Sequence, residues 1–65
     1  MERSRFIAAL RDEAKAVGLP FKVDLRRGKG SHALVTVGAA YTFVPDRDID
    51  PKTAKKIRKA LGLPE

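Results

Sequence analysis

Apolar residues recur every three or four positions near the start of the chain, which is the spacing of one face of an α-helix. This stripe consists of Phe6, Ile7, Leu10, Ala14 and Val17. Ser4 is expected to cap the helix, because a serine hydroxyl can accept a hydrogen bond from an unpaired amide of the first turn. Gly18 can adopt the left-handed conformation that ends a helix, and Pro20 prevents its continuation. The pattern therefore predicts a helix over residues 4–17.

The period changes to two residues from residue 21 onward, which is typical of strands with one buried face. A first strand is predicted over residues 21–26, and its core-facing residues are expected to be Phe21, Val23 and Leu25. A second and a third strand are predicted over residues 32–37 and 40–44. Gly38-Ala39 between them fits a two-residue type II′ turn, in which a glycine at the first central position matches the twist of the strands.

The second predicted strand has two different faces, because successive side chains of a strand point to opposite sides. The side that we expect to face the core consists of Ala33, Val35 and Val37. The opposite side consists of His32, Leu34 and Thr36. The alternation thus places the one histidine of the chain at the start of a strand, on the side away from the core.

A second helical pattern follows a polar connector, residues 46–50, in which Ile49 is expected to be anchored in the core. Asp50 is suited to be the N-cap, and Pro51 is suited to the first helical position. The helix is predicted over residues 51–61, where Gly62 and Pro64 end it. Its buried stripe is expected to be Ala54, Ile57 and Leu61.

The connector resembles the opening of a calcium-binding loop, with acidic residues at alternate positions: Asp46, Asp48 and Asp50. The similarity ends there. Pro51 occupies the position where such a loop needs glycine, and Ile57 occupies the position where it needs glutamate. The sequence therefore predicts no metal site.

The predicted elements follow the order helix, strand, strand, strand, helix. Sequential hairpin-linked strands form an antiparallel sheet, and two amphipathic helices bury their stripes most simply on one face of it. We therefore predict an α+β fold of αβββα order, with residues 1–65 as a single domain. This two-layer arrangement resembles the double-stranded-RNA-binding domain, and it leaves the opposite face of the sheet open.

The 65-residue chain carries 14 Lys and Arg residues against 8 Asp and Glu residues, a net charge of +6. Such an excess on a small surface favours a polyanionic partner, nucleic acid first. The absence of cysteine excludes disulfides and thiolate metal sites. No uncharged stretch reaches the ~20 residues that a membrane-spanning helix needs. We therefore expect a soluble, cytoplasmic protein that does not bind membranes.

Reactive side chains are concentrated in residues 26–32, which contain three cations, two glycines, a serine and the histidine. Arginine and lysine place positive charge where a phosphate can bind, and glycine lets the backbone approach a ligand closely. Histidine exchanges protons near neutral pH. We predict that this hairpin loop is the functional end of the protein. A solvated basic turn with an incidental histidine is the alternative interpretation.

Positive charge is also concentrated on the second predicted helix, which carries five cations and no acidic residue in one run: Lys52, Lys55, Lys56, Arg58 and Lys59. Such a run is usually a solvated face. In a chain that is already basic, it also fits a contact with nucleic acid or with an acidic protein. Both interpretations stay open at this point.

Several segments resemble the HicA family of toxins, the small ribonuclease half of type II toxin–antitoxin pairs. The matching residues are Lys29-Gly30-Ser31-His32, Val44-Pro45, the helix entry Ile49-Asp50-Pro51-Lys52-Thr53 and the helix end Leu61-Gly62-Leu63. The resemblance extends over more than half of the chain. The offsets between these segments, in so short a chain, make the combination fairly specific.

The resemblance implies a single HicA-like toxin domain with the fold of a double-stranded-RNA-binding domain. It implies a metal-independent, cofactor-free endoribonuclease that cleaves messenger RNA and so inhibits translation, with His32 as the catalytic residue and a HicB-like antitoxin as the partner that masks the site. Many relatives carry a histidine soon after the Val-Pro pair, where this chain has Asp46 and Arg47. A weaker or altered nuclease follows if that second histidine assists catalysis.

The chemistry of RNA cleavage suggests roles for the neighbouring residues. RNA carries its own nucleophile, the 2′-hydroxyl, so an enzyme must deprotonate it and stabilise the negative charge that develops on the phosphate. His32 suits the proton transfer, and Lys29 is expected to hold the phosphate. Further contacts to the RNA backbone are expected from Arg26, Arg27, Gly30 and Ser31.

The alternative function is a non-catalytic basic module that binds structured RNA through its shape and its phosphates. A DNA-binding helix is disfavoured, because no helix-turn-helix pair precedes the cationic helix. Leu34 shares a side of the strand with His32 and is a candidate contact for the antitoxin. The candidate RNA contacts on the second helix are Lys52, Lys55, Lys56 and Lys59.

Overall fold

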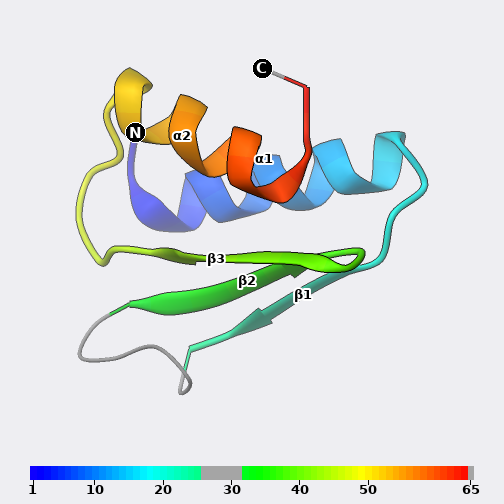
Figure 1. Ribbon diagram of the computed structural model, residues 1–65. Helices are drawn as coiled ribbons and strands as arrows, with labels where there is room; N and C mark the ends of the chain where they lie inside the picture. The colour runs from blue at the N-terminus through cyan, green and yellow to red at the C-terminus, as the bar shows by residue number, and fades with distance from the viewer. Residues whose placement is uncertain (26–31, 65) are drawn as a thin grey trace.

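Five elements follow one another in the computed structural model, which describes residues 1–25 and 32–64. They are α1 (Arg3–Ala16), β1 (Phe21–Asp24), β2 (Ala33–Val37), β3 (Ala40–Val44) and α2 (Pro51–Leu61). The strands form one antiparallel sheet in the order β1-β2-β3. Both helices cover the same face of this sheet (Figure 1). The predicted α+β arrangement, with two helices on one face of a three-stranded antiparallel sheet, is therefore confirmed.

A two-residue turn at Gly38-Ala39 joins β2 to β3, since Val37 pairs directly with Ala40. Gly38 has a φ of 59°, and no described residue other than glycine has a positive φ, so that of Ala39 is negative. These signs match the predicted type II′ turn. The amide of Gly38 also donates a hydrogen bond to the carbonyl of Pro20 at 2.9 Å, which ties the turn to the segment before β1.

Helix α1 begins one residue earlier than predicted, and Ser4 is not its N-cap. Glu2 is the capping residue, and its carbonyl accepts the first helical hydrogen bond from the amide of Phe6. Ser4 therefore lies inside the first turn, where its hydroxyl donates to the carboxylate of Glu2 instead of accepting from a backbone amide. At the other end Gly18 has a φ of 73°, the left-handed conformation predicted for it.

Helix α2 has the predicted bounds and the predicted caps. The Asp50 carboxylate accepts a hydrogen bond from the amide of Thr53 at 2.7 Å. Gly62 is left-handed, with a φ of 72°, and the amide of Leu63 donates to the carbonyl of Arg58 at 2.9 Å. This closing turn satisfies a carbonyl that the helix end would otherwise leave unpaired, and it directs Leu63 into the core, where it is buried.

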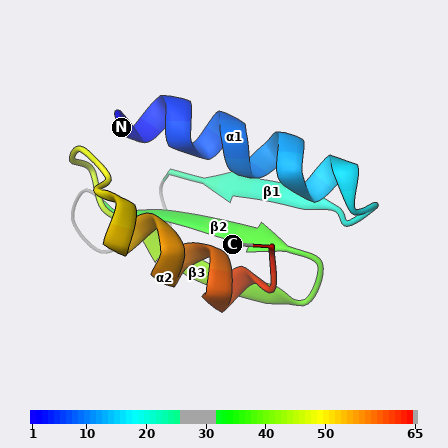
Figure 2. The same cartoon turned by 90° about the horizontal axis from the view of Figure 1, so that it is seen from above.

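The core lies between the helices and the covered face of the sheet. α1 lies on the β1 side and α2 on the β3 side, as the view from above shows (Figure 2). The buried cluster consists of Phe6, Leu10, Ala14, Val35, Val37, Val44, Ile49, Ala54, Ile57, Leu61 and Leu63. The predicted stripe of α2, the covered face of β2 and the anchor Ile49 are all confirmed as buried. Neither helix in the described part of the chain has the length and apolarity that crossing a membrane requires.

Three residues predicted to be buried are exposed: Val17 at 46%, Val23 at 37% and Leu25 at 60%. Helix α1 ends before Val17. Val23 lies on the covered face, because it pairs with Val35, but β1 is an edge strand whose far end the helices leave accessible. β1 ends at Asp24, short of the predicted residue 26, so Leu25 lies beyond the sheet. Alternation predicted the side of the strand correctly, and it carries no information on whether a helix covers that side.

Candidate nucleic-acid interface

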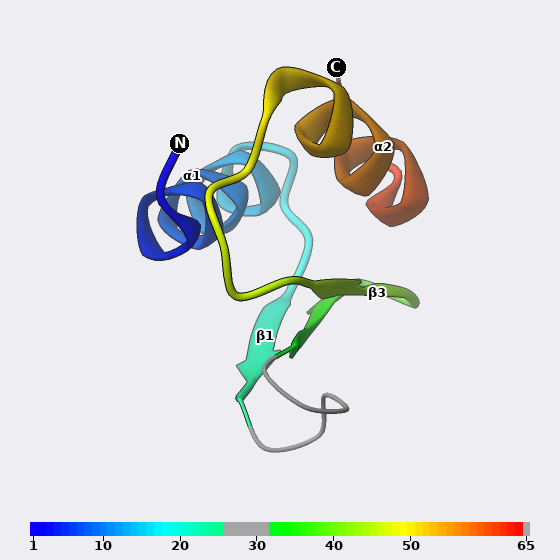
Figure 3. The same ribbon diagram turned by 90° about the vertical axis from the view of Figure 1, so that its left-hand side faces the viewer.

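His32 lies immediately before β2 and is exposed to solvent. The alternation of β2 assigns it to the side of Leu34 and Thr36, which are half-buried, whereas Ala33 and Val35 are buried on the other side. The side of Leu34 and Thr36 faces away from both helices (Figure 3). The observed strand thus begins one residue later than predicted, and it leaves His32 at the entry to the open face.

The remaining predicted residues of the loop lie outside the described residues: Arg26, Arg27, Lys29, Gly30 and Ser31. What the structure gives is the position of the flanking strands. Asp24 pairs with Leu34, so the chain leaves β1 and enters β2 at the same end of the sheet. Leu25 and His32, the described residues on either side of this segment, therefore lie at the same end of the sheet.

Two aromatic rings that sequence reasoning did not single out lie on the open face of β3. Tyr41 pairs with Thr36 and Phe43 pairs with Leu34, and directly paired residues share a face of the sheet. Tyr41 is 65% exposed and Phe43 is 45% exposed. The sequence carries only part of the signal: both rings are out of phase with Val44, and the packed sheet is needed to show that Val44 is buried.

A shallow hollow of about 240 Å³ lies on the same face, lined by Lys22, Asp24, Leu34 and Thr36. In the register, Lys22 is opposite Thr36 and Asp24 is opposite Leu34. The open face therefore changes from charged on β1 to aromatic on β3. Leu34, the candidate partner contact, occupies the central strand between Asp24 and Phe43. Its role in binding a partner stays a prediction.

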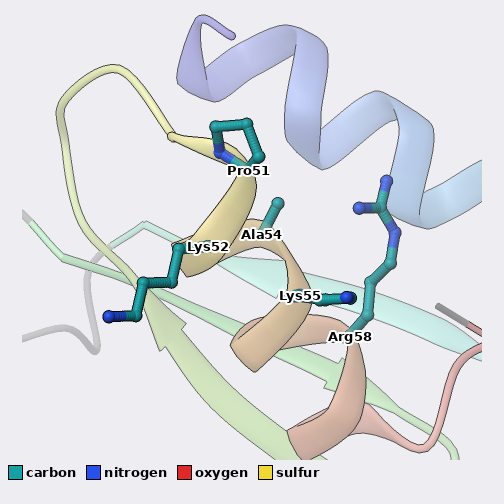
Figure 4. A pocket seen from close by; sticks show the side chains of 5 residues that line it. All are labelled: Pro51, Lys52, Ala54, Lys55 and Arg58. Carbon is teal, nitrogen blue, oxygen red and sulfur yellow. The ribbon is translucent and has the colours of Figure 1, made fainter.

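The four lysines of α2 that were predicted to contact RNA are all exposed: Lys52, Lys55, Lys56 and Lys59. They belong to the helix layer, because α2 packs on the covered face of the sheet. Figure 4 shows a hollow on this layer, with Lys52 pointing away from it. Its lining residues are Pro51, Lys52, Ala54, Lys55 and Arg58. The structure therefore places these lysines on the helix layer and not on the open face of the sheet.

Arg58 differs from the other cations of α2, because its charge is engaged inside the fold. Its side chain points toward α1 (Figure 4) and makes an ion pair with Glu13, at 2.9 Å between Nε and Oε1. The hydrogen bond that Arg58 donates to Glu13 raises the pKa of Arg58 above its ordinary value. Arg58 also lies over the ring of Phe6, with 5.3 Å from its guanidinium carbon to the ring centroid. Arg58, which is not among the four lysines predicted to contact RNA, thus has partners within the fold.

Two carboxylates of the connector before α2, those of Asp46 and Asp50, have partners within the fold. Asp46 forms an ion pair with Arg3, at 3.3 Å between Oδ1 and Nε. Asp50 caps α2, and the hydrogen bond from the backbone amide of Thr53 is the main reason that the pKa of Asp50 is lowered. Within residues 1–25 and 32–64, no three His, Asp or Glu side chains are grouped as metal ligands would be.

Comparison with known proteins assigns no family to the chain. No protein-family model, no curated protein and no solved structure matches it. A function has therefore to be inferred from the residues themselves and from where the fold places them.

Proposed function

We propose that this protein is a metal-independent endoribonuclease of the HicA toxin type, which cleaves messenger RNA and so inhibits translation. The observation that supports this best is the position of His32. It is the one histidine of the chain, it is exposed, and it lies immediately before β2. The alternation of β2, continued by one residue, assigns it to the side of the sheet opposite the helices. A long RNA strand can reach such a side chain without any opening of the fold. The net charge of +6 favours the approach of a polyanion.

In the proposed reaction, His32 removes the proton from a 2′-hydroxyl of the RNA, and the resulting oxyanion attacks the adjacent phosphorus. The bond from phosphorus to O2′ forms as the bond to O5′ breaks, which gives a 2′,3′-cyclic phosphate and a 5′-hydroxyl end. Lys29, with Arg26 or Arg27, is proposed to stabilise the negative charge on the phosphate. The leaving O5′ takes its proton from water or from Lys29.

We extend the proposal to the fold type and the partner. The αβββα order and the two helices on one sheet face support a fold of the double-stranded-RNA-binding type. The exposure of His32 supports control by a second protein of the HicB antitoxin type, since a partner can reach and mask an exposed side chain. Leu34 is proposed to lie in the interface with this antitoxin.

A second candidate function is a non-catalytic RNA-binding module, and one observation favours it. Asp46 follows the Val44-Pro45 pair, where many HicA relatives carry a second histidine, and in this protein it is paired with Arg3. One imidazole cannot easily be both base and acid in the same step. Loss of the second group would weaken cleavage and leave binding intact.

The test is RNA cleavage by the purified protein in the presence of a metal chelator, beside the variant His32→Ala. We expect the parent to cleave and the variant to be inactive yet folded, because an exposed side chain contributes little to stability. Circular dichroism and binding of an RNA with methylated 2′-hydroxyls are the controls. Cleavage by His32→Ala at the parent rate contradicts the role proposed for His32. Binding without cleavage by the parent supports the second candidate.

A further inference from the structure

The chain presents half of its aromatic residues to solvent on one face. It has one tyrosine, three phenylalanines and no tryptophan. Phe6 is buried in the core, and Phe21 packs against it. Tyr41 and Phe43, which we call the aromatic platform, lie two residues apart on the open side of β3. Exposed rings forgo the stabilisation that burial would give them, and a patch of neighbouring exposed apolar groups marks a binding surface.

The open face is too small to hold a folded protein by itself. Three strands of four or five residues form a surface of roughly 15 by 17 Å, whereas each partner in a stable protein complex buries ~800 Å². Stacking of nucleobases needs no such area, because each ring can bind one base. The dimensions of the face therefore suit a single nucleic-acid strand, whereas a protein that covers the face, such as the proposed antitoxin, must also contact residues beyond it.

The charge of the chain also favours nucleic acid. The net charge of +6 attracts a polyanion from a distance, and the strand that carries the platform contains no acidic residue to repel it. Lys22 and Asp24 on β1 oppose one another in sign, so the hollow that they line adds no net repulsion.

The polar groups of that hollow suit the edges of bases. Lys22 can donate hydrogen bonds, Asp24 can accept them and the hydroxyl of Thr36 can do both. Proteins recognise single-stranded RNA by stacking its unpaired bases on aromatic side chains and by hydrogen bonding to the edges of those bases. A duplex offers neither feature, because its bases are stacked on one another and paired.

We propose that the aromatic platform binds two unpaired bases of single-stranded RNA and holds the strand beside His32. This inference rests on the function proposed above and specifies its substrate as single-stranded rather than duplex RNA. Phe43 pairs with Leu34, and His32 lies two residues before Leu34, immediately ahead of β2. Continuing the alternation of β2 by one residue assigns His32 to the side of the platform, next to the row of Phe43. Tyr41 and Phe43 act as binding residues, and His32 acts on the phosphate next to the nucleotide bound on Phe43, on the side away from Tyr41.

The experiment uses the intrinsic fluorescence of the protein. Tyr41 is the one tyrosine and the chain has no tryptophan, so the emission reports directly on the platform. The probe is a short oligouridine with methylated 2′-hydroxyls, which can stack but cannot be cleaved. We expect this probe to quench the emission to saturation, and a duplex RNA of the same length to leave it nearly unchanged.

Variants distinguish loss of the aromatic rings from loss of the fold as the cause of weaker binding. Tyr41→Ala and Phe43→Ala are each expected to weaken binding of a dye-labelled probe by about 5- to 150-fold, the range that loss of one base–aromatic stack gives. Tyr41→Phe keeps the ring and should bind like the parent. Val17→Ala is the matched control, because it removes a 46% exposed apolar side chain at the end of α1, away from the sheet. Circular dichroism checks that each variant is folded.

The outcomes distinguish this inference from the proposed function. If the parent cleaves RNA and the ring variants bind and cleave as the parent does, the role proposed for the platform is wrong and the proposed ribonuclease activity is unaffected. If the probe quenches the emission of Tyr41 and the alanine variants bind weakly, but the parent never cleaves RNA, the role proposed for the platform is correct and the protein is a binding module. If Tyr41→Ala changes only the sedimentation of the protein, the face is a protein interface and the inference is overturned.

Discussion

The guanidinium group of Arg58 makes two parallel hydrogen bonds to the carboxylate of Glu13, from Nε to Oε1 and from Nη2 to Oε2, each of 2.9 Å. This pair joins α2 to α1 across a sequence separation of 45 residues. The two helices otherwise pack against different strands at opposite edges of the sheet. The paired geometry fixes the orientation of both side chains, which single ion pairs do not. Arg58 and Glu13 therefore set how the two helices sit side by side over the core.

This pair should contribute measurably to stability. We expect a double-mutant cycle of Glu13→Gln and Arg58→Gln, measured by urea unfolding, to give a coupling of about 1–2 kcal/mol, because both side chains are less than one third exposed. The control is a cycle on Arg11 and Asp12, whose side chains are 65% and 75% exposed and whose coupling should be near zero. Equal coupling in the two cycles would show that the paired geometry is unimportant.

The Asp50 cap of α2 should make the stability of the protein depend on pH in the acidic range. The hydrogen bond from the Thr53 amide lowers the pKa of Asp50 in the folded protein, so the unfolded chain binds the proton more readily. The stabilisation is therefore present above the ordinary carboxyl pKa of ~3.9 and is lost as the pH falls through the lower, folded value. Asp50→Asn keeps a capping acceptor but should abolish this part of the pH dependence, as measured by melting temperature between pH 2 and pH 7.

Asp50→Ala supplies the matching comparison. It removes the cap at every pH, so its melting temperature should lie below that of Asp50→Asn even at neutral pH. If Asp50→Asn shows the same acid dependence as the parent, other carboxylates are responsible for it.

Whether the lysines of α2 contact RNA can be tested by the salt dependence of RNA binding. If Lys52, Lys55, Lys56 and Lys59 contact phosphates, replacing each by glutamine should flatten the plot of log affinity against log salt by ~0.7 per lost contact with single-stranded RNA. Lys15→Gln at the exposed end of α1 is the control and should leave the slope unchanged. A slope that none of the four substitutions alters would identify this face of α2 as simply solvated.

Masking by an antitoxin leads to another prediction. The covering surface should be acidic, since it competes with RNA for the cations around His32, and it should bury apolar area, because exposed charge pairs alone contribute little. We therefore expect the complex with the product of the adjacent gene to survive salt concentrations that release RNA. A cleavage assay on the purified complex checks it. A bound partner that leaves the ribonuclease fully active would rule out masking of His32.

A variant can locate this interface. Leu34→Thr shortens the apolar contact at the centre of the open face without placing a charge there. It should weaken the antitoxin complex and leave the fold intact, because Leu34 lies outside the buried cluster. If the affinity for the antitoxin is unchanged, the interface does not include this position on β2.

The parts of the fold that could be predicted are those with local causes. Asp50, Gly38 and Gly62 each determine the nearby backbone through their own chemistry, so α2 and the β2–β3 turn were placed correctly. The exposure of Val23 could not be predicted, because it depends on how far α1 extends over an edge strand. Ser4 was misassigned because the helix begins before it, at a residue with no side-chain cap of its own.

The site was predictable to a similar degree. The open side of Leu34 and Thr36 followed from the alternation of β2, although His32, predicted as part of that strand, lies just before it. The distinct role of Arg58 did not, since its partner Glu13 is 45 residues away and the sequence shows only another cation in a cationic run. Tyr41 and Phe43 needed the phase of β3, and the phase is fixed by Val44, whose burial follows only from the packed sheet.

The register of the strands alone determines which of their residues lie in the core and which lie on the open face. Val35 lies in the core, while its neighbours Leu34 and Thr36 belong to the open side. Inserting or deleting one residue in β2 would exchange the two sets, turning a valine to solvent and a threonine into the core. Substitution on the open side disturbs no core contact. Residues on the open side can therefore change quickly among proteins of the same fold, as long as the strands keep their lengths. The ligand sequences that such proteins prefer can change with them.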